Sequence, residues 1–375
     1  MKKICFVATV PTAVHSFMKG HIRASAKKWA ITIISHPDSA EILGGLDAKF
    51  IPLSIERKPS PWRDLLVLVR MVILFRRQRF DLVHSIMPKT GLSAMLAGFL
   101  AGVPNRLHTF TGQVWANKLG WKRGALKLFD KLIVSFATQI FVDSPSQRDF
   151  LVAEGVLPKS KGIVIGHGSI CGVDAQQFHP DTQVREAVRS ELNIGQEQTV
   201  ILFVGRLNRD KGMLDLAAAF AEIASHKVNV VLILVGAEDG VPFAVVQGIC
   251  GAHRERLRRV SFTANPERYM AAADIFCLPS YREGFGQVII EAAASSVPTV
   301  ASRIYGITDA VEDGKTGLLF PVGDVAALTQ ALLKLIVDRD LRREMGEAAR
   351  VRTLTLFPRQ KITDEMGAFY GKLLG

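Results

Sequence analysis

Residues 274–294 read DIFCLPSYREGFGQVIIEAAA, and this stretch decides the fold of the second half of the chain. A short apolar run ends at Ser280, a polar turn follows, and two glycines come just before a helical pattern that begins at Gln287. A strand, a glycine-containing turn and a helix in this order form half of a βαβ unit. Glycines at the start of a helix also leave backbone N–H groups open to a phosphate. The stretch therefore predicts a parallel α/β domain with an anion-binding turn.

The same alternation of short apolar runs and helical patterns continues on both sides. In the second half, strands are expected at residues 199–206, 229–236, 259–264, 274–280, 299–303 and 317–320. In the first half, they are expected at residues 2–9, 29–35, 49–55, 80–86, 105–111, 139–144 and 162–168. Because strands that alternate with helices build parallel sheets covered on both faces, the sequence predicts two doubly wound, Rossmann-like α/β domains.

The border between the domains is expected in the glycine-rich passage GHGSICGVDAQQFHP, near residues 172–180. We predict a first domain over residues 1–175, a second over residues 176–356, and a helical tail over residues 357–375 that starts at a break at Pro358. Doubly wound domains bind ligands at the carboxyl ends of their strands, so the active site is expected in the cleft between the two domains.

Composition excludes several classes of protein. The four cysteines form no CxxC pair and no Cys/His cluster, so neither a zinc site nor a disulfide framework is indicated and a reducing, cytoplasmic compartment is expected. The opening MKKICFVATVP resembles a signal peptide only superficially, because its apolar run is short and Pro11 interrupts it, and a buried first strand is expected. No run approaches the roughly 18 apolar residues that span a bilayer.

The net charge of +12 is unevenly distributed. Residues 1–174 carry 24 Lys and Arg against 11 Asp and Glu, whereas the remainder carries 23 against 24. Such asymmetry indicates a polyanionic partner, and the absence of aromatic–basic RNA motifs and zinc fingers argues against nucleic acid. Residues 61–80 and 115–136 combine apolar positions with arginine and lysine, so we expect this half to lie at an anionic membrane surface. The alternative is that the apolar stripes pack on the sheet and the charges face water.

Basic residues gather at the end of the first strand of the second half, in the stretch FVGRLNRDKG. Arg206 and Lys211 flank a short loop that begins at Gly205. Two fixed cations beside a phosphate-binding helix end can neutralise a departing diphosphate, so we expect both to be catalytic. The alternative is that they are solvated loop residues.

Two carboxylates bracket the glycine turn, with seven residues between them. Glu291 lies at most about two turns into the helix, near enough to reach ribose hydroxyls beside a bound diphosphate. Glu283 lies in the loop, where it could face a sugar. The alternative is an ordinary strand–loop–helix junction with two surface carboxylates.

The stretches GRLNRDKG, LPSYREGFGQVIIEA and VASRIYGITDAVEDGKTGLLFPVGD resemble glycosyltransferase family 4 enzymes of the GT-B fold, over about residues 199–327. In the first half, FDLVHSIMPKTG and GHGSICGVDAQQFHP resemble members that build bacterial surface polysaccharides. The resemblance implies a retaining reaction that needs no metal and no cofactor, and a UDP- or GDP-sugar as donor. It implies that the final helix returns to the first domain.

The resemblance also implies the roles of individual residues. Arg206 and Lys211 would contact the donor diphosphate, Glu291 the ribose, and Glu283 the donor sugar. The other expected donor-binding residues are Gly205, Gly284, Phe285 and Gly286.

One position departs from the family pattern. Many members carry a His-Gly pair after a first-domain strand, and here Thr111 precedes Gly112 in RLHTFTGQVW. His108 lies three residues earlier, and in an extended strand its side chain should face away from the sheet face shared by Thr109 and Thr111. His108 is therefore either a substrate contact or a packed strand-end histidine. Further acceptor-side candidates are His15, His84 and Lys89, with placement on the surface as the alternative for each.

These observations predict a cytoplasmic enzyme on the inner face of the membrane. It would transfer a sugar, with retention, from a nucleotide-sugar, expected to be UDP-linked, to a growing polyprenyl-diphosphate-linked glycan such as O-antigen or capsule. Two other hypotheses remain open. The first is a sugar-nucleotide epimerase or a phosphorylase of the same architecture, and the second is a non-catalytic binder in a polysaccharide assembly complex.

Overall fold

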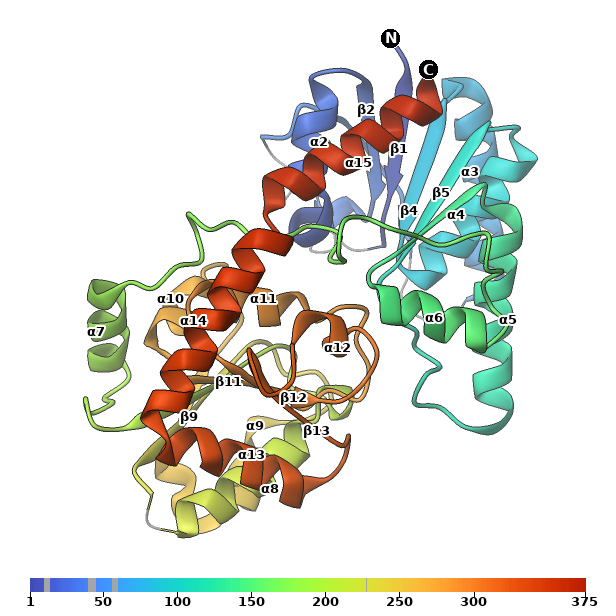
Figure 1. Ribbon diagram of the computed structural model, residues 1–375. Coiled ribbons are helices and arrows are strands. Elements are labelled where there is room, and N and C mark those ends of the chain that lie inside the picture. The colour runs from blue at the N-terminus through green and yellow to red at the C-terminus, as the bar shows by residue number, and fades with distance from the viewer. Residues whose placement is uncertain (10–13, 40–44, 56–59, 227) are drawn as a thin grey trace. The chain divides into compact units, whose positions relative to one another are not determined.

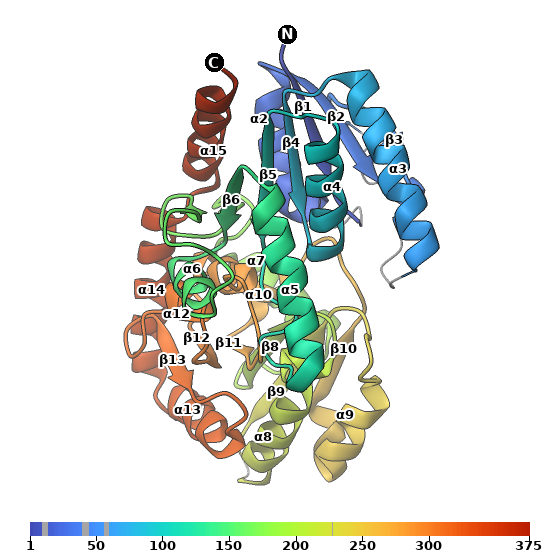
Figure 2. The same ribbon diagram turned by 90° about the vertical axis from the view of Figure 1, so that its right-hand side faces the viewer.

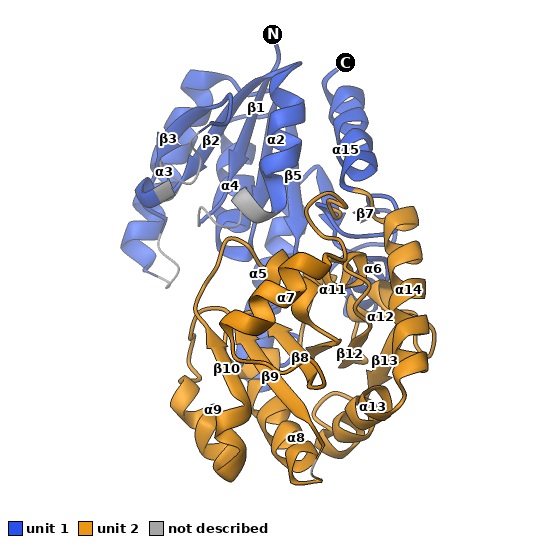
Figure 3. Cartoon of the chain, turned by 90° about the vertical axis from the view of Figure 1, so that its left-hand side faces the viewer, with its two compact units in different colours: residues 1–171, 359–375 blue, residues 172–358 orange. Residues whose placement is uncertain are grey.

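The structure is a computed structural model that describes residues 1–9, 14–39, 45–55, 60–226 and 228–375. The chain divides into two compact units, shown in Figure 3. Unit 1 comprises residues 1–171 and 359–375, and unit 2 comprises residues 172–358. Each unit is built around one parallel sheet, as the alternating pattern predicts.

The sheet of unit 1 has the strand order β3-β2-β1-β4-β5-β6-β7 over the described residues. Every strand falls within a range expected from the sequence. The bounds are β1 (Lys3–Val7), β2 (Ala30–Ser35), β3 (Lys49–Pro52), β4 (Leu82–Ile86), β5 (Asn105–Phe110), β6 (Gln139–Val142) and β7 (Ile163–Val164). The order reverses direction beside β1, as in doubly wound sheets.

Helices cover both faces of this sheet. On one face α3 (Pro61–Gln78), α4 (Pro88–Leu100) and α5 (Gly120–Phe136) lie side by side, as Figure 2 shows. On the other face α2 (Lys19–Ala26) contacts α15 (Arg359–Leu374), the last helix of the chain, as Figure 1 shows. The remaining elements are η1 (Val14–Met18), η2 (Pro37–Ser39) and α6 (Pro145–Ala153).

The chain leaves unit 2 at Pro358, and α15 then packs in unit 1. The buried Tyr370 lies against Phe6, Trp29 and His84, with ring centroids 5.9–6.2 Å apart. Its hydroxyl lies 2.7 Å from Nδ1 of His84. The last helix is thus part of the core of unit 1 even though it follows unit 2 in sequence.

The sheet of unit 2 has the order β10-β9-β8-β11-β12-β13. All of its strands are expected from the sequence, although β10 begins two residues before the predicted range. The bounds are β8 (Thr199–Val204), β9 (Val230–Val235), β10 (Leu257–Val260), β11 (Ile275–Leu278), β12 (Thr299–Ser302) and β13 (Gly317–Phe320). β8, β9 and β11 are almost entirely buried, as expected of strands covered on both faces.

Two helical layers sandwich this sheet. One contains α8 (Met213–Ser225), α9 (Phe243–Cys250) and α13 (Val325–Val337), and the other contains α7 (Thr182–Glu191), α10 (Glu267–Ala272), α11 (Gln287–Ala294) and α14 (Arg339–Leu356). Short elements complete the unit: η3 (Arg209–Lys211), η4 (Gly251–Arg256) and α12 (Ile307–Ala310). Within the described ranges no helix is both long enough and apolar enough to cross a bilayer.

Candidate active site

The loop after β8 is shaped by one asparagine and one glycine. Asn208 begins η3, because its Oδ1 accepts a hydrogen bond of 2.9 Å from the backbone N–H of Lys211. Gly212 then starts α8 with φ +69°, a left-handed conformation that favours glycine. A Cβ at this position would lie 1.9 Å from the carbonyl oxygen of Pro279. The absence of a side chain therefore lets the loop after β8 touch the loop after β11.

The loop after β11 depends on glycine in the same way. Gly286 has φ +87° and starts α11, which begins at Gln287 as the sequence predicts. Gly306, the residue before α12, also has a positive φ of +82°, and a Cβ there would lie 2.5 Å from the carbonyl oxygen of Gly284. The side chain of Phe285 is buried and packs on Phe357, with ring centroids 5.1 Å apart. Phe285 can therefore offer a ligand only its backbone.

Lys211 and Glu283, which the sequence analysis singled out separately, form an ion pair through Lys211 Nζ and Glu283 Oε1. Their side chains are 23% and 13% exposed, so the pair is mostly shielded from water. Ser280 Oγ donates a second hydrogen bond of 2.8 Å to the same carboxylate oxygen. The loops after β8 and β11 thus bring one cation and one carboxylate together at the carboxyl edge of two neighbouring strands.

Arg206 lies on the same edge, directly after Gly205, and pairs with Asp239 in the loop after β9. Both side chains are about half exposed, and Asn208 Nδ2 donates to the same Asp239 oxygen at 3.2 Å. Between Asp239 and Glu283 a continuous set of contacts therefore runs across three strand ends. It passes through Asn208 and Lys211, and Arg206 joins it at Asp239.

Glu291 lies on α11, one turn after Gln287. Gln287 Nε2 donates to Oε1 of Glu291 at 3.3 Å and to the carbonyl oxygen of Gly172 at 2.8 Å. Residues four apart share a helix face, so these two side chains present their polar groups together. Glu291 is half-buried, and its carboxylate is held by its own helix.

A second group of contacts fastens the two loops from behind. Arg282 Nε donates to Asp210 Oδ2 at 2.9 Å, and the hydroxyl of Tyr281 donates to Asp215 Oδ2 at 2.7 Å. That hydrogen bond is the main reason why the pKa of Tyr281 rises to about 12. The backbone N–H of Tyr281 also donates to the carbonyl oxygen of Asp210. The candidate site is thus a preformed arrangement rather than a set of loose loop side chains.

Several of these residues were absent from the sequence-based set. Asp239 follows β9, the strand beside β8, and the rule that parallel strands carry ligands at their carboxyl ends could have identified it. Asn208 stands three residues before Lys211, the spacing of a helix cap. Ser280 and Gln287 gave no such signal, because their roles depend on contacts with the loops around them.

In unit 1 the sequence-based expectation for His84 needs correction. His84 is fully buried within β4, with Nδ1 2.7 Å from the Tyr370 hydroxyl and Nε2 2.7 Å from Thr109 Oγ1. Burial holds its pKa well below the usual value, with smaller effects from His108 and His21. Because side chains alternate along a strand, His84 points into the core beneath α15. It is therefore not exposed on the surface and does not face an acceptor.

His108 is also a core residue. Its Nδ1 lies 2.9 Å from Ser85 Oγ, its ring packs on Phe110, and burial lowers its pKa to about 3. The prediction that it faces away from Thr109 is confirmed, because Thr109 pairs with His84 on the opposite face of the sheet. Of the two alternatives for His108, a substrate contact or a packed strand-end histidine, the structure shows the packed histidine.

The remaining acceptor-side candidates differ in position. Lys89, in the first turn of α4, forms an ion pair of 2.8 Å with Asp64 of α3. Thr111 is half-buried and directly follows β5. His15 falls in η1, and its side chain lies outside the part of the structure that is described.

The loop after β5 is anchored by Trp115, which is fully buried. Its Nε1 donates to Asp130 of α5 at 2.7 Å, and its ring stacks on Phe150 of α6 at 5.3 Å. Burial raises the pKa of Asp130 to about 6 despite this hydrogen bond. These contacts hold the segment that carries Thr111 against the helices.

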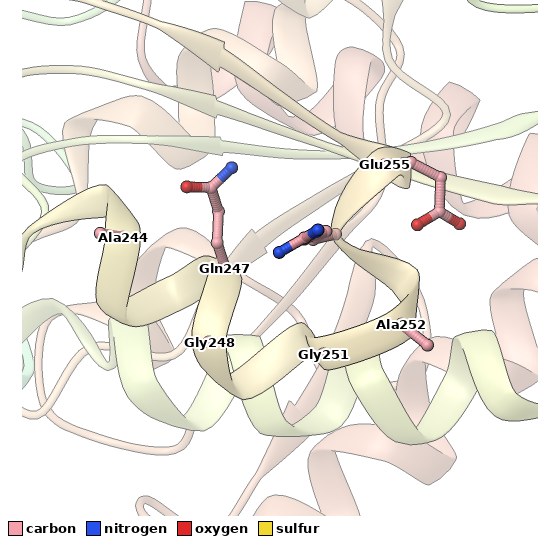
Figure 4. A pocket seen from close by; sticks show the side chains of 7 residues that line it. Ala244, Gln247, Gly248, Gly251, Ala252 and Glu255 are labelled. Atoms are coloured by element: carbon pink, nitrogen blue, oxygen red, sulfur yellow. The ribbon is translucent and has the colours of Figure 1, made fainter.

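The described surface of unit 2 also has a hollow of about 780 Å³ over α9 and η4, shown in Figure 4. Its lining is mostly small, with Gln247, Arg254 and Glu255 as the polar side chains. None of the candidate site residues lines it. In the described residues no three His, Cys, Asp or Glu side chains are arranged to hold a metal ion.

Comparison with known proteins extends the resemblance over both units. A family model described as "Glycosyl transferases group 1" matches residues 184–352, and a "Glycosyl transferase 4-like domain" model matches residues 23–168. The alpha-maltose-1-phosphate synthase of Mycolicibacterium smegmatis is 31% identical over 310 residues, which cover 78% of this chain and 79% of that protein. The chain belongs to glycosyltransferase family 4.

Two further relatives of this glycosyltransferase are informative. The capsular polysaccharide biosynthesis glycosyltransferase CapM of Staphylococcus aureus is 29% identical over 377 residues, covering 100% of this chain and 98% of CapM. The UDP-Gal:alpha-D-GlcNAc-diphosphoundecaprenol alpha-1,3-galactosyltransferase of Escherichia coli is 27% identical, covering 78% of this chain and 76% of that enzyme.

Solved structures establish that the fold is GT-B. The sucrose-phosphate synthase of Thermosynechococcus elongatus superposes with a TM-score of 0.83 at 23% identity and covers 100% of this chain and 99% of that chain. The Anabaena protein HepE in complex with UDP superposes with a TM-score of 0.81 at 19% identity and covers 99% of this chain and 100% of HepE.

Proposed function

We propose that this glycosyltransferase moves a sugar, with retention of anomeric configuration, from a UDP-linked donor to a growing polyprenyl-diphosphate-linked bacterial surface glycan such as O-antigen or capsule. The observation that carries the proposal is the pairing of Lys211 with Glu283, beside Arg206, at the carboxyl ends of β8 and β11. Two cations, Arg206 and Lys211, and two carboxylates, Glu283 and Asp239, meet at this edge. Cations suit a diphosphate leaving group, and a carboxylate suits the hydroxyls of a sugar.

Each residue has a chemical role in the proposal. Arg206 and Lys211 stabilise the negative charge that develops on the departing diphosphate, while Glu291 accepts hydrogen bonds from the ribose hydroxyls. Glu283 binds the donor sugar and holds Lys211 in position. Gly205, Gly284, Phe285 and Gly286 contribute backbone groups to the donor. Side-chain cations supply the charge stabilisation, so the reaction we propose needs neither a metal nor a cofactor.

Retention follows from attack on the face that the leaving group departs from. The bond between sugar C1 and the β-phosphate oxygen breaks as the acceptor oxygen bonds to C1 on the same face. The acceptor proton passes to an oxygen of the departing diphosphate, which leaves as UDP. No protein base is needed in this scheme, so it accommodates Thr111, which stands where the family resemblance implies a histidine. The enzyme contributes position and charge stabilisation.

The similar proteins support the donor and acceptor in the proposal. HepE was solved with UDP, and the name of the Escherichia coli relative specifies UDP-Gal and a diphosphoundecaprenol-linked sugar. CapM, which this chain matches along its length, acts in capsular polysaccharide biosynthesis. A lipid-linked acceptor lies in the membrane, so we place the enzyme in the cytoplasm, at the inner face of the cytoplasmic membrane and bound to its anionic surface. The excess of positive charge in residues 1–174 supports that location.

Nucleotide release from a panel of UDP- and GDP-sugars, with and without a detergent extract of bacterial lipid-linked sugars, tests the proposal. We expect UDP release that depends on the extract and is lost in Glu283→Ala and Lys211→Ala. Sugar conversion without an acceptor would replace the transferase by an epimerase. Tight nucleotide binding without turnover on any acceptor would favour a non-catalytic binder.

A further inference from the structure

Large apolar side chains that are exposed to solvent gather on one helical layer of unit 1. Of the 18 found in the described residues, 11 belong to α3, α4, α5 or the residue before α5. They are Trp62, Leu65, Leu66, Val69, Ile73, Phe99, Leu100, Leu119, Trp121, Leu128 and Phe129. Scattered apolar residues are normal on a protein surface, whereas a concentration on adjacent helices indicates an interaction surface. We call this set the apolar layer.

Helix α3 shows that the exposure is not a by-product of core packing. Val67, Met71 and Phe75 are buried and form the face that packs on the sheet. At 100° per residue, the five exposed positions from Trp62 to Ile73 fall on the opposite side of the helix. The helix thus has two apolar faces, only one of which the fold buries. The alternative given by the sequence is that the apolar residues of this helix pack on the sheet. It accounts for the buried face of α3 but not for its exposed apolar face.

Helix α5 repeats this arrangement. Ile133 and Val134 are buried against the sheet, whereas Trp121, Leu128 and Phe129 point outward and are 78%, 55% and 47% exposed. Because α3 and α5 both run antiparallel to the strands, their N-termini lie at the carboxyl edge of the sheet of unit 1. Each helix carries its exposed tryptophan within its first two residues. The two tryptophans therefore stand at the same end of the layer.

The charge around the apolar layer selects the partner. Arg63, Arg70 and Arg77 are seven residues apart and line one flank of the exposed face of α3, and all three are exposed. Lys122 and Lys131 are exposed on α5. The acidic residues of the two helices, Asp64 and Asp130, are held by Lys89 and Trp115. A second copy of the chain would bring like charges together, whereas an anionic bilayer offers both an apolar interior and negative headgroups.

We infer that the apolar layer docks on an anionic lipid bilayer, with Trp62 and Trp121 in the interfacial region and the arginine row of α3 on the lipid phosphates. This inference deepens the proposed function, because it assigns the membrane contact to one face and sets its orientation. With both tryptophans at the carboxyl edge of the sheet, docking holds the loops after β4 and β5 near the headgroups. Lys89, in the first turn of α4 after the first of these loops, and Thr111, in the second, lie at this edge, where we place the diphosphate of a lipid-linked acceptor.

Vesicle sedimentation of the full chain tests the inference, with pure phosphatidylcholine compared with a mixture containing phosphatidylglycerol. Val69→Glu should weaken binding to the mixed vesicles by about tenfold or more, because a charge would enter the apolar contact. Val351→Glu is the matched control, since Val351 is also an exposed helical valine, on α14 of unit 2. Replacing Arg63, Arg70 and Arg77 together by Gln should weaken binding about 100-fold and reduce its salt dependence, with Lys122 and Lys131 still present. Equal binding by the two Val→Glu variants would overturn the inference.

Tryptophan fluorescence tests insertion separately. Brominated phosphatidylcholine in the mixed vesicles should quench the wild-type emission, and the quenching should disappear in the Trp62→Phe/Trp121→Phe variant, which keeps Trp29 and the buried Trp115. Sedimentation without quenching of the wild type would overturn insertion of the layer.

Activity separates this inference from the proposed function. Val69→Glu should retain wild-type UDP binding and wild-type transfer to the detergent extract, but transfer more slowly to acceptor in vesicles. Vesicle binding without transfer in any format would leave the docking surface standing and remove the proposed reaction. If the wild type transfers sugar in detergent but does not bind vesicles, the proposed reaction would stand and the docking surface would be removed.

Discussion

The two units share a strand order but use the carboxyl ends of their strands differently. The orders β3-β2-β1-β4-β5-β6 and β10-β9-β8-β11-β12-β13 are equivalent, so β11 corresponds to β4. After β8 and β11, glycines with positive φ bring charged loops together, and Lys211 pairs with Glu283. In β4 and β5 the polar residues His84 and His108 are instead buried within the sheet. The same topology thus carries a polar site at the strand ends of unit 2 and buried histidines within the largely apolar core of unit 1.

The contrast extends to the helices. Apart from Met1, unit 1 carries all its large exposed apolar side chains on α3, α4 and α5 or next to them, within the described residues. In unit 2 they are spread over several elements, such as Phe262 after β10 and Val351 on α14. Topology therefore fixes where a site can form, and the side chains at strand ends and on outer helix faces decide its chemistry.

The largest effect should come from removing the cation of the strand-end pair in unit 2. Lys211→Ala should lower kcat for sugar transfer about 100- to 1,000-fold, because one preorganised group would no longer stabilise the developing charge on the diphosphate. Lys315→Ala is the control, since Lys315 is paired with Glu312 at 3.1 Å elsewhere in unit 2. Steady-state rates that agree within threefold between the two variants would remove Lys211 from the mechanism.

The contact between the loops after β8 and β11 can be tested through Gly212. Gly212→Ala should cost about 3 kcal/mol of unfolding free energy, because the new Cβ would meet the carbonyl oxygen of Pro279 as well as strain a positive φ. Gly314→Ala has a similar φ of +77° and nothing within 4 Å of its Cβ, so it should cost only about 1 kcal/mol. Urea titrations of both variants measure the difference, and equal midpoints would show that the loops are not in tight contact.

The buried histidines of unit 1 predict a pH dependence of stability. Burial lowers the pKa of His21 to about 4 and of His108 to about 3, from 6.5 in the unfolded chain, and lowers that of His84 as well. Below about pH 6.5 the unfolded state therefore binds protons that the folded state does not. The free energy of unfolding should therefore decrease as the pH is lowered, by up to about 1.4 kcal/mol per pH unit for each histidine.

Asp130 acts in the opposite direction, because its raised pKa of about 6 makes the folded state bind a proton more tightly than the unfolded state. One carboxyl group opposes three histidines, so the net slope should keep the sign set by the histidines. Urea midpoints measured from about pH 7 to about pH 4 test this slope. His108→Gln should make the slope shallower whatever it does to stability at neutral pH, and an unchanged slope would contradict the assignment.

The smallest effect should come from the exposed pair in unit 2. Asp239→Asn should change the unfolding free energy by less than about 0.5 kcal/mol, because both Asp239 and Arg206 are about half exposed and water screens their attraction. The donor KM should change less than about threefold, as expected for a half-exposed pair. Thermal melts and initial rates measure both quantities. A tenfold rise in KM would mean that Asp239 holds Arg206 in place for the donor, despite its exposure.

Much of the fold follows from the sequence because local pattern and tertiary structure agree. Buried parallel strands must be short apolar runs, and every strand except β10 lies within a range predicted from such a run. β10 reads LRRV and is only partly buried. Gln287 starts α11 as expected, because Gly284 and Gly286 interrupt the chain just before it. Element boundaries are harder to predict than the elements themselves. β10, for example, begins at Leu257, two residues before the predicted range.

The side chains of the candidate site were harder to predict. Arg206, Lys211, Glu283 and Glu291 could be singled out because charged residues stand out at the end of an apolar strand. Strand alternation also gave the facing of His108 relative to Thr109 correctly. The same alternation could not tell that His84 lies beneath α15, because its partner Tyr370 is 286 residues away.

The sequence by itself determined two parallel α/β units, the positions of their strands and the polar turns that end β8 and β11, because these depend on the period and composition of short segments. Tertiary structure alone decided that Lys211 meets Glu283, that Asp239 meets Arg206, and that the outer face of α3 stays uncovered. The two ion pairs join residues far apart in the chain, and the uncovered face reflects what the rest of the chain leaves unpacked. Their distances depend on how loops and helices pack, which no local pattern encodes.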